Sequence, residues 1–255
     1  LKIAYDQGAY LGPTQKSAIR DAMQRHPAAV LLTIDHPSGE IFTYNVAQDD
    51  APWPVPVILV APKDDAALAA AEQRGEAVSL SVTGHYAHQV QGRNLIGRLD
   101  RGKARTLVVS TPESSWFTSS CERGPGIAAF LATAAMAARS LPDMNLVFVA
   151  TTGHEVGHGG MEYFIKDRAP QPKDVALWLH YGAALACRGA GDAPDNRATR
   201  VLAYSSSIQP YAEAAFRDVA ATRLVRDKAN VGELREILGA GYPHVLGMAA
   251  LHPYF

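Results

Sequence analysis

Two histidines flank a glutamate in the segment His154-Glu155-Val156-Gly157-His158. This order matches the H-E-x-x-H pattern, in which two histidines on one face of a helix bind a zinc ion. The surrounding sequence argues against such a helix. Residues 146–150 form a short apolar run that predicts a buried strand, and each glycine that follows destabilises a helix by about 1 kcal/mol relative to alanine. We therefore expect a strand whose carboxyl end delivers His154 and Glu155 into a site, where open α/β sheets place their chemistry.

Cys121 suggests one chemistry for this site, that of a thiol hydrolase. It precedes a helix predicted over residues 126–140, and the N-terminus of a helix lowers the pKa of a nearby thiol. His154 would take the thiol proton, while Glu155 or His180 would orient the imidazole. The structural alternative is that Cys121 only fills a core, as buried cysteines often do.

A rebuilt metal site is the second chemistry. Cys121, Glu155 and His180, with His154 or His158 nearby, offer sulfur, oxygen and nitrogen ligands that suit one zinc ion with a bound water. That water would attack an amide or ester carbonyl. The structural alternative is that His180, which closes a predicted strand, only bonds a loop.

Aromatic residues in the loop before Cys121 are candidates for substrate binding. Trp116 and Phe117 would either wall a pocket or pack the loop. His158, beyond the glycine that follows Val156, is grouped with them as a substrate-binding residue.

Composition describes an ordinary globular chain. The sequence has 255 residues, of which 47% are hydrophobic and 19% charged, with a formal net charge of −1. The mixed charges predict no nucleic-acid partner, and no apolar run approaches the roughly 18 residues of a membrane span. The two cysteines, Cys121 and Cys187, could pair but are too few for a disulfide framework. Because the chain starts at Leu1 without a methionine, we expect a fragment or a processed product.

The first 90 residues alternate strand and helix signals. Strands are predicted at 2–5, 28–34, 55–60 and 78–82, and helices at 14–25 and 64–74. Gly75 ends the second helix, as helix capping predicts.

Longer α/β units follow from Asn94. Strands are predicted at 95–99, 106–110, 146–150, 175–180, 201–204 and 244–247, and helices at 126–140, 161–166 and 210–221. Alternating strands and helices indicate an α/β fold with a largely parallel sheet that is covered on both faces.

Several segments, in order, resemble the co-catalytic zinc exopeptidases, the family that includes bacterial leucyl aminopeptidases and glutamate carboxypeptidase. The matching segments are 94–99, 107–113, 119–129, 148–163 and 240–255. The resemblance implies a mostly parallel, doubly wound sheet of the zinc exopeptidase type over residues 91–255, truncated at both ends. Residues 1–90 resemble the smaller α/β protease-associated insert of many members. A secreted or periplasmic location would fit this family.

The metal site of that family is degenerate here. Family members hold two zinc ions with His, a bridging Asp, Glu, a second Asp and a C-terminal His, and a neighbouring Glu serves as general base. By motif, the first His falls on Pro112, the bridging Asp on Cys121 or Glu122, the general base on His154, the ligand Glu on Glu155 and the second Asp on His180. The last His would lie beyond Phe255. Only Glu155 is kept.

Two functions remain open. The first is a hydrolase of the aminopeptidase type that cleaves a peptide, amide or ester bond in a small or peptide-like molecule. It would use Cys121 and His154, or one zinc ion on Glu155, His180 and Cys121. The second is a receptor-like binding protein that keeps the fold without metals or catalysis. The substrate and the oligomeric state are not predicted.

Overall fold

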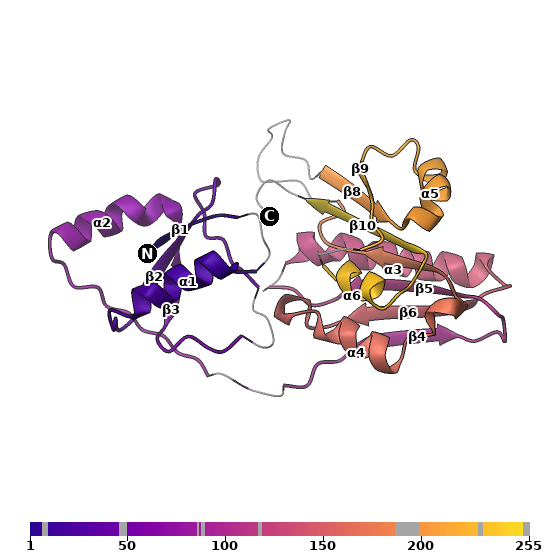
Figure 1. The fold of residues 1–255 in the computed structure, drawn as a ribbon, viewed down its shortest axis with the longest axis horizontal. Helices are drawn as coiled ribbons and strands as arrows, with labels where there is room; N and C mark the ends of the chain where they lie inside the picture. The colour runs from indigo at the N-terminus through magenta and orange to yellow at the C-terminus, as the bar shows by residue number, and fades with distance from the viewer. Residues whose placement is uncertain are drawn as a thin grey trace. The chain divides into compact units, whose positions relative to one another are not determined.

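A computed structural model describes residues 1–6, 10–45, 50–85, 87, 90–116, 119–186, 199–228 and 232–251. Contacts divide the chain into two units, the first spanning Leu1–Val90 and the second beginning at Gln91 (Figure 1). We describe each unit by itself. Within the described ranges, no helix combines the length and the apolar character needed to cross a membrane.

The first unit is built on a small parallel sheet. Its strands are β1 (Lys2–Ala4), β2 (Val30–Asp35) and β3 (Val57–Val60), in that order across the sheet. Its helices are α1 (Pro13–Met23), the 3₁₀ turn η1 (Pro62–Asp64) and α2 (Asp65–Gln73). Ile19 of α1 is fully buried among the apolar side chains of β1 and β2. The apolar face of α1 therefore closes the core of this unit.

The strand predicted over 78–82 is wrong. These residues have no regular structure, and the side chains of Val78 and Val82 are exposed. Alternation of apolar and polar residues favours a strand only where a neighbouring strand pairs with it, because backbone groups need partners. Among the described residues no strand lies beside this segment.

The second unit contains a seven-stranded sheet with the order β4-β6-β5-β7-β10-β8-β9. The strands are β4 (Leu95–Leu99), β5 (Thr106–Pro112), β6 (Asn145–Thr151), β7 (Val175–Tyr181), β8 (Thr199–Tyr204), β9 (Thr222–Val225) and β10 (Val245–Leu251). Neighbouring strands run parallel except at β4–β6 and β10–β8. The predicted class, an α/β fold with a mostly parallel sheet, is confirmed.

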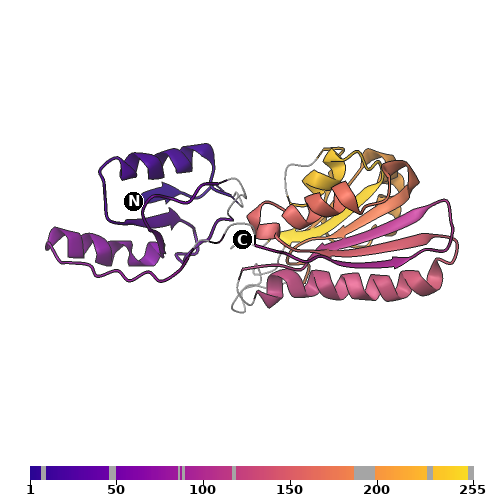
Figure 2. The same cartoon turned by 90° about the horizontal axis from the view of Figure 1, so that it is seen from below.

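Helices cover both faces of this sheet (Figure 2). The helices are α3 (Ser120–Ser140), α4 (Gly159–Asp167), α5 (Gln209–Ala215) and α6 (Leu234–Gly239), with 3₁₀ turns η2 (His154–Val156), η3 (Pro172–Asp174) and η4 (Ser206–Ile208). Neighbouring residues of a strand face opposite sides, so Val108 packs with α4 and α6 while Val109 packs with α3. The two layers make the sheet a rigid base for the loops at its ends.

Helix α3 begins at Ser120, six residues before the predicted start. Pro125 lies inside it, although a proline in a helix removes one backbone hydrogen bond and its ring crowds the carbonyl four residues earlier. A Cβ on Gly126 would lie 2.9 Å from the carbonyl oxygen of Gly182, so this glycine lets α3 approach the end of β7 closely.

Other elements also differ from the prediction. β9 and α6 were not predicted, and α5 ends at Ala215 rather than near 221.

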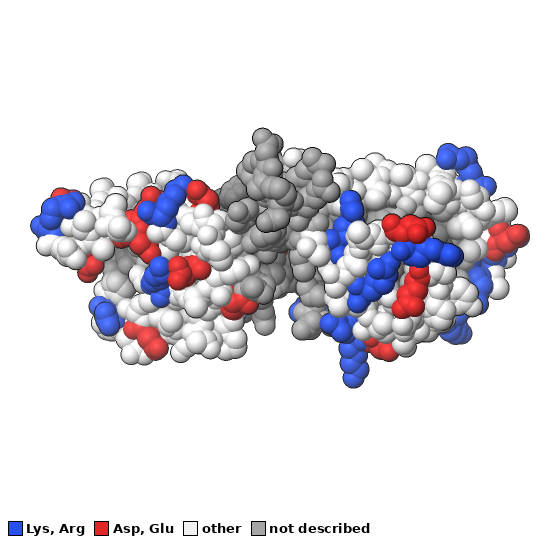
Figure 3. Space-filling view, turned by 90° about the horizontal axis from the view of Figure 1, so that it is seen from above, with Lys and Arg blue, Asp and Glu red and all other residues white. Residues whose placement is uncertain are grey.

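Charges on the drawn face of each unit are mixed. Figure 3 shows basic and acidic side chains lying next to one another on both units. This agrees with the overall net charge of −1.

Candidate functional site

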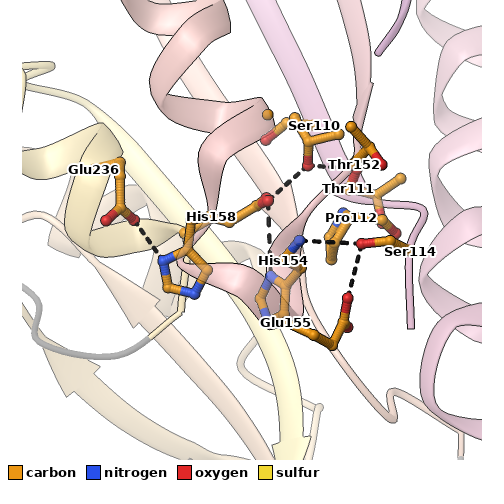
Figure 4. Close-up of polar contacts among 12 residues, drawn as sticks. Ser110, Thr111, Pro112, Ser114, Thr152, His154, Glu155, His158 and Glu236 are labelled. Atoms are coloured by element: carbon orange, nitrogen blue, oxygen red, sulfur yellow. Dashed lines mark hydrogen bonds and ion pairs between the residues drawn. The ribbon is translucent and has the colours of Figure 1, made fainter. Parts of the chain in front are cut away.

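The carboxyl ends of three parallel strands meet at one edge of the larger sheet. Pro112 at the end of β5 pairs with Thr151 at the end of β6, and Ser110 of β5 pairs with His180 of β7. The segments that follow β5 and β6 carry their side chains to this edge (Figure 4). It is the edge at which the sequence predicted a site.

The H-E-x-x-H segment is not an α-helix. His154 to Val156 form the 3₁₀ turn η2, and Gly157 and His158 follow in left-handed conformations with φ of 94° and 64°. A left-handed residue interrupts a right-handed helix. The turn nevertheless brings the imidazole rings of His154 and His158 to a centroid distance of 4.7 Å.

Glu155 belongs to a buried ion-pair group centred on Arg123. Arg123 Nη2 lies 2.6 Å from Glu155 Oε1 and 2.9 Å from Glu122 Oε1. Ser114 Oγ donates to Glu155 Oε2 at 2.8 Å and accepts from the His154 backbone N–H at 3.0 Å (Figure 4). Arg123 is 4% exposed and Glu155 is 7% exposed, so a guanidinium in the interior holds the carboxylates of both glutamates.

The pKa of Glu155 lies below its usual range. Burial raises this pKa. The hydrogen bonds from Arg123 and Ser114, together with the charge of Arg123, lower the pKa by more than burial raises it. A carboxylate with a lowered pKa stays ionised near neutral pH and accepts a proton poorly. Glu155 is therefore suited to ion pairing rather than to general-base catalysis.

A second group joins histidines with two glutamates that the sequence did not single out. His154 Nδ1 lies 3.7 Å from Glu233 Oε1, an ion-pair separation, and His158 Nδ1 lies 3.0 Å from Glu236 Oε2 (Figure 4). His180 Nδ1 lies 4.0 Å from Glu233 Oε2. The three predicted histidines therefore surround carboxylates from the start of α6.

Both glutamates of this group have pKa values below the usual range. Burial raises the pKa of Glu233, and the interactions with His154 and His180 outweigh it. Burial likewise raises the pKa of Glu236, and the hydrogen bond with His158 outweighs it. Fully buried Glu233 is thus held as a carboxylate by its neighbours.

His180 is held in its neutral form. Burial lowers its pKa to about 4, although the charge of Glu233 opposes this shift. Ser110 Oγ lies 2.9 Å from His180 Nδ1 and accepts a hydrogen bond from Trp178 Nε1 at 2.8 Å. Nδ1 of His180 is therefore held by the Ser110 hydroxyl, whichever of the two groups donates the proton.

Cys121 offers no thiol in this structure. It is the second residue of α3 and is disulfide-bonded, and a disulfide sulfur has no proton to give to His154. The thiol-hydrolase prediction therefore requires a reduced form of the protein. Cys187, the other cysteine of the sequence, lies outside the described residues.

The aromatic residues predicted to bind substrate are only partly described. Trp116 is half-buried in the loop after β5. Phe117 lies outside the described residues. The role of Trp116, Phe117 and His158 in binding substrate stays a prediction.

The donor set at this edge does not fit a zinc ion. Within the described part of the chain, no three His, Cys, Asp or Glu side chains are arranged to hold a metal. Glu122 and Glu155 are bonded to a guanidinium that does not lose its proton, and Pro112 has no ligand atom in its side chain. A dication bound to these carboxylates would lie against the fixed positive charge of Arg123.

Sequence reasoning missed three charged residues of the site. Arg123 follows Glu122 in a segment that resembles an Asp-containing loop of the family, and these two adjacent opposite charges were the available signal. Glu233 and Glu236 come from the start of a short helix with no motif. Contacts that join residues 78 positions apart, as His158 and Glu236 do, leave no local pattern.

Comparison with solved structures identifies the fold. A zinc aminopeptidase from Bacillus subtilis matches 97% of this chain at 15% identity with a TM-score of 0.62. An aminopeptidase from Aneurinibacillus matches 98% at 15% identity with a TM-score of 0.61. A peptidase M28 precursor from Shewanella amazonensis matches 99% at 12% identity with a TM-score of 0.63. The chain has the zinc exopeptidase fold, as the resemblance predicted.

The chain covers 58%, 60% and 59% of the lengths of these three structures. No protein-family model matches the sequence, and no curated protein matches it. The likeness therefore concerns the fold, and activity has to be argued from the site itself.

Proposed function

We propose that this chain is a non-catalytic binding protein with a zinc exopeptidase fold, in which Arg123 takes the place of a metal. One observation carries the proposal: the guanidinium of Arg123 bonds to both Glu122 and Glu155 in the interior. By the family motif, these carboxylates stand at or beside metal-binding positions. A permanent organic cation thus supplies the positive charge that the two carboxylates require.

The energetics favour keeping this arrangement. Removing one partner of a buried ion pair costs about 3–5 kcal/mol, because the other charge is left uncompensated. A zinc ion that captured Glu155 would take away one of the two carboxylate partners of Arg123 and leave it paired with Glu122 alone. The ion pair between Arg123 and Glu155 therefore opposes capture of Glu155 by a metal.

Two buried atoms support a role in binding a polar ligand. Arg123 Nη1 and Glu233 Oε2 have no hydrogen-bond partner among the described residues. An unsatisfied buried polar group costs about 1–3 kcal/mol. A ligand that accepts a hydrogen bond from Arg123 Nη1, or that donates one to Glu233 Oε2, would satisfy these atoms. Since the matched structures are peptidases, we propose a peptide-like ligand.

The first unit has a proposed role as well. Residues 1–90 would form a protease-associated-like subdomain. Its separate core supports this assignment.

A metal-free hydrolase is the second candidate function. His154 Nδ1 lies 3.7 Å from the buried carboxylate of Glu233, and the His154 side chain is 16% exposed. A histidine beside an acidic residue is the usual arrangement of a general base. In this hypothesis His154 would activate a water molecule.

Hydrolysis assays separate the two candidates. The purified protein would be incubated with leucine p-nitroanilide and with short peptides, in the presence of added zinc and, in parallel, of a chelator. The binding proposal predicts no hydrolysis above the uncatalysed rate in either condition. Chelator-resistant hydrolysis that is lost in His154→Ala would establish the metal-free hydrolase instead. Hydrolysis that needs zinc and Glu155 would reject the binding proposal.

A further inference from the structure

The long side of the larger sheet that is formed by its outermost strand, β4, is open; it is distinct from the edge at which the parallel strands end. β4 is the first strand in the sheet order and pairs only with β6 among the described strands. All five of its residues are exposed, and Leu95, Ile96 and Leu99 are exposed by 66%, 40% and 40%. An exposed apolar edge strand presents free backbone donors and acceptors that can pair with another strand.

The segment that contains β4 is strongly basic. Residues 91–105 hold five basic residues and one acidic residue, whereas the whole chain has a net charge of −1. The basic residues are Arg93, Arg98, Arg101, Lys103 and Arg105. They lie before β4, within it and in the turn after it, so positive charge flanks the open edge at both ends.

Neighbouring groups neutralise little of this charge. The Arg98 and Arg101 guanidiniums donate to backbone carbonyls at the C-terminal ends of α4 and α3. These carbonyls hold the side chains in place, and their partial negative charge offsets only part of each full positive charge. Lys103 Nζ lies 3.5 Å from Asp143, whose side chain is 90% exposed. An ion pair of this exposure contributes little.

The two faces of β4 carry different side chains. Leu95, Gly97 and Leu99 point to one face, and Ile96 and Arg98 point to the other, because residues alternate along a strand. A strand added beside β4 would place its own alternate residues next to these side chains. Apolar residues suit the first face, and acidic residues suit the face that carries Arg98.

We propose that the outer edge of β4 binds an extended acidic peptide segment, which joins the sheet as a further strand. The partner alternates apolar and acidic residues and pairs through its backbone. Self-pairing of two copies is disfavoured, because it would bring two basic edges together. The proposal goes beyond the proposed function and holds whether or not the central site is catalytic.

Fluorescence anisotropy with labelled peptides tests the proposal at low salt. The probe is a peptide of alternating valine and glutamate. One control peptide replaces glutamate by lysine, and a second keeps the charge but has proline at alternate positions, which prevents strand pairing. We expect saturable binding of the first peptide only, weakening as salt screens the charges.

Protein variants locate the binding edge. Leu95→Asn should weaken binding by about fivefold, which corresponds to the roughly 1 kcal/mol of one cross-strand pair. The matched control is Leu131→Asn on α3, which is 60% exposed and outside the edge. Arg93→Glu should also weaken binding, whereas Arg200→Glu on β8 should not.

Three results would overturn the proposal. Equal binding of the proline-containing peptide or of single-stranded DNA would show a general anion surface without strand pairing. Concentration-dependent dimerisation that is lost in Leu95→Asn, with no peptide binding, would show that a second copy uses this edge. Failure to bind the valine–glutamate peptide at all would reject the site.

Discussion

At the scale of single residues, the site depends on how Arg123 satisfies two carboxylates. A guanidinium is planar, always charged and rich in hydrogen-bond donors, so it can bond to Glu122 and Glu155 at once. A zinc ion in such a place would require neutral histidines and free carboxylates around it. The charge of Arg123 therefore governs how both carboxylates are held at this edge.

His180 makes stability depend on pH. Its pKa is about 4 in the folded protein and about 6.5 when unfolded. Between these values the unfolded chain binds a proton that the folded protein does not, so the free energy of unfolding falls as the pH falls through this window. The loss from this group is on the order of 3 kcal/mol. Urea unfolding at a series of pH values measures it.

The control for this prediction removes the titrating group. His180→Asn should flatten the dependence between pH 6.5 and pH 4, while His26→Asn, at an exposed position in the first unit, should leave it unchanged. An equally steep dependence in His180→Asn would assign the effect to other groups.

Part of this site was predictable from the sequence. His154, Glu155 and His180 follow or end predicted strands, and the structure places all of them at the same edge of the sheet. The roles of Arg123 and Glu233 were not predictable, since each depends on contacts with residues far along the chain. The bonding of Cys121 was also undecided by the sequence, which allowed a thiol or a disulfide.

At the scale of elements, the turn between β6 and α4 positions the histidines. A Cβ on Gly160 would lie 2.3 Å from the Thr152 carbonyl oxygen and 2.6 Å from Asn94 Oδ1. Thr152 N–H and Gly160 O are also the groups that Asn94 bonds. The start of α4 therefore fits against the end of β6 only because residue 160 has no side chain.

Gly160→Ala should destabilise the second unit. Overpacking of this kind costs about 1–3 kcal/mol. The matched control is Gly124→Ala in α3, where nothing lies within 4 Å of the added Cβ; it should stabilise the helix by up to about 1 kcal/mol. Thermal unfolding compares the two variants. Equal stability of both would contradict the close approach at Gly160.

Elements with strong local signals were predicted well. Strands β5, β6 and β7 have apolar runs that favour a buried strand, and the structure confirms them. Segment 78–82 was wrong because alternation alone does not supply a partner strand. The start of α3 was misplaced because proline and glycines suggested a loop, whereas close packing against β7 favours a helix there.

At the scale of the whole molecule, the chain combines a small α/β unit with a zinc exopeptidase sheet. The sheet supplies an edge at which parallel strands end, and open α/β sheets generally place their functional groups at such an edge. Here the same edge holds buried ion pairs around Arg123 and Glu233. The carboxylates of Glu122 and Glu155 at this edge are thus paired with a guanidinium, and Glu233 lies beside histidines.

Zinc titration of the purified protein tests the central claim most directly. Isothermal titration calorimetry would be performed on the wild type and on Glu155→Gln, which keeps the shape of the side chain but removes its charge. If Arg123 takes the place of the metal, the wild type should show no saturable zinc binding that depends on Glu155. Binding of about one zinc ion per chain, typical of an enzyme site with protein ligands, and its loss in Glu155→Gln would contradict the account.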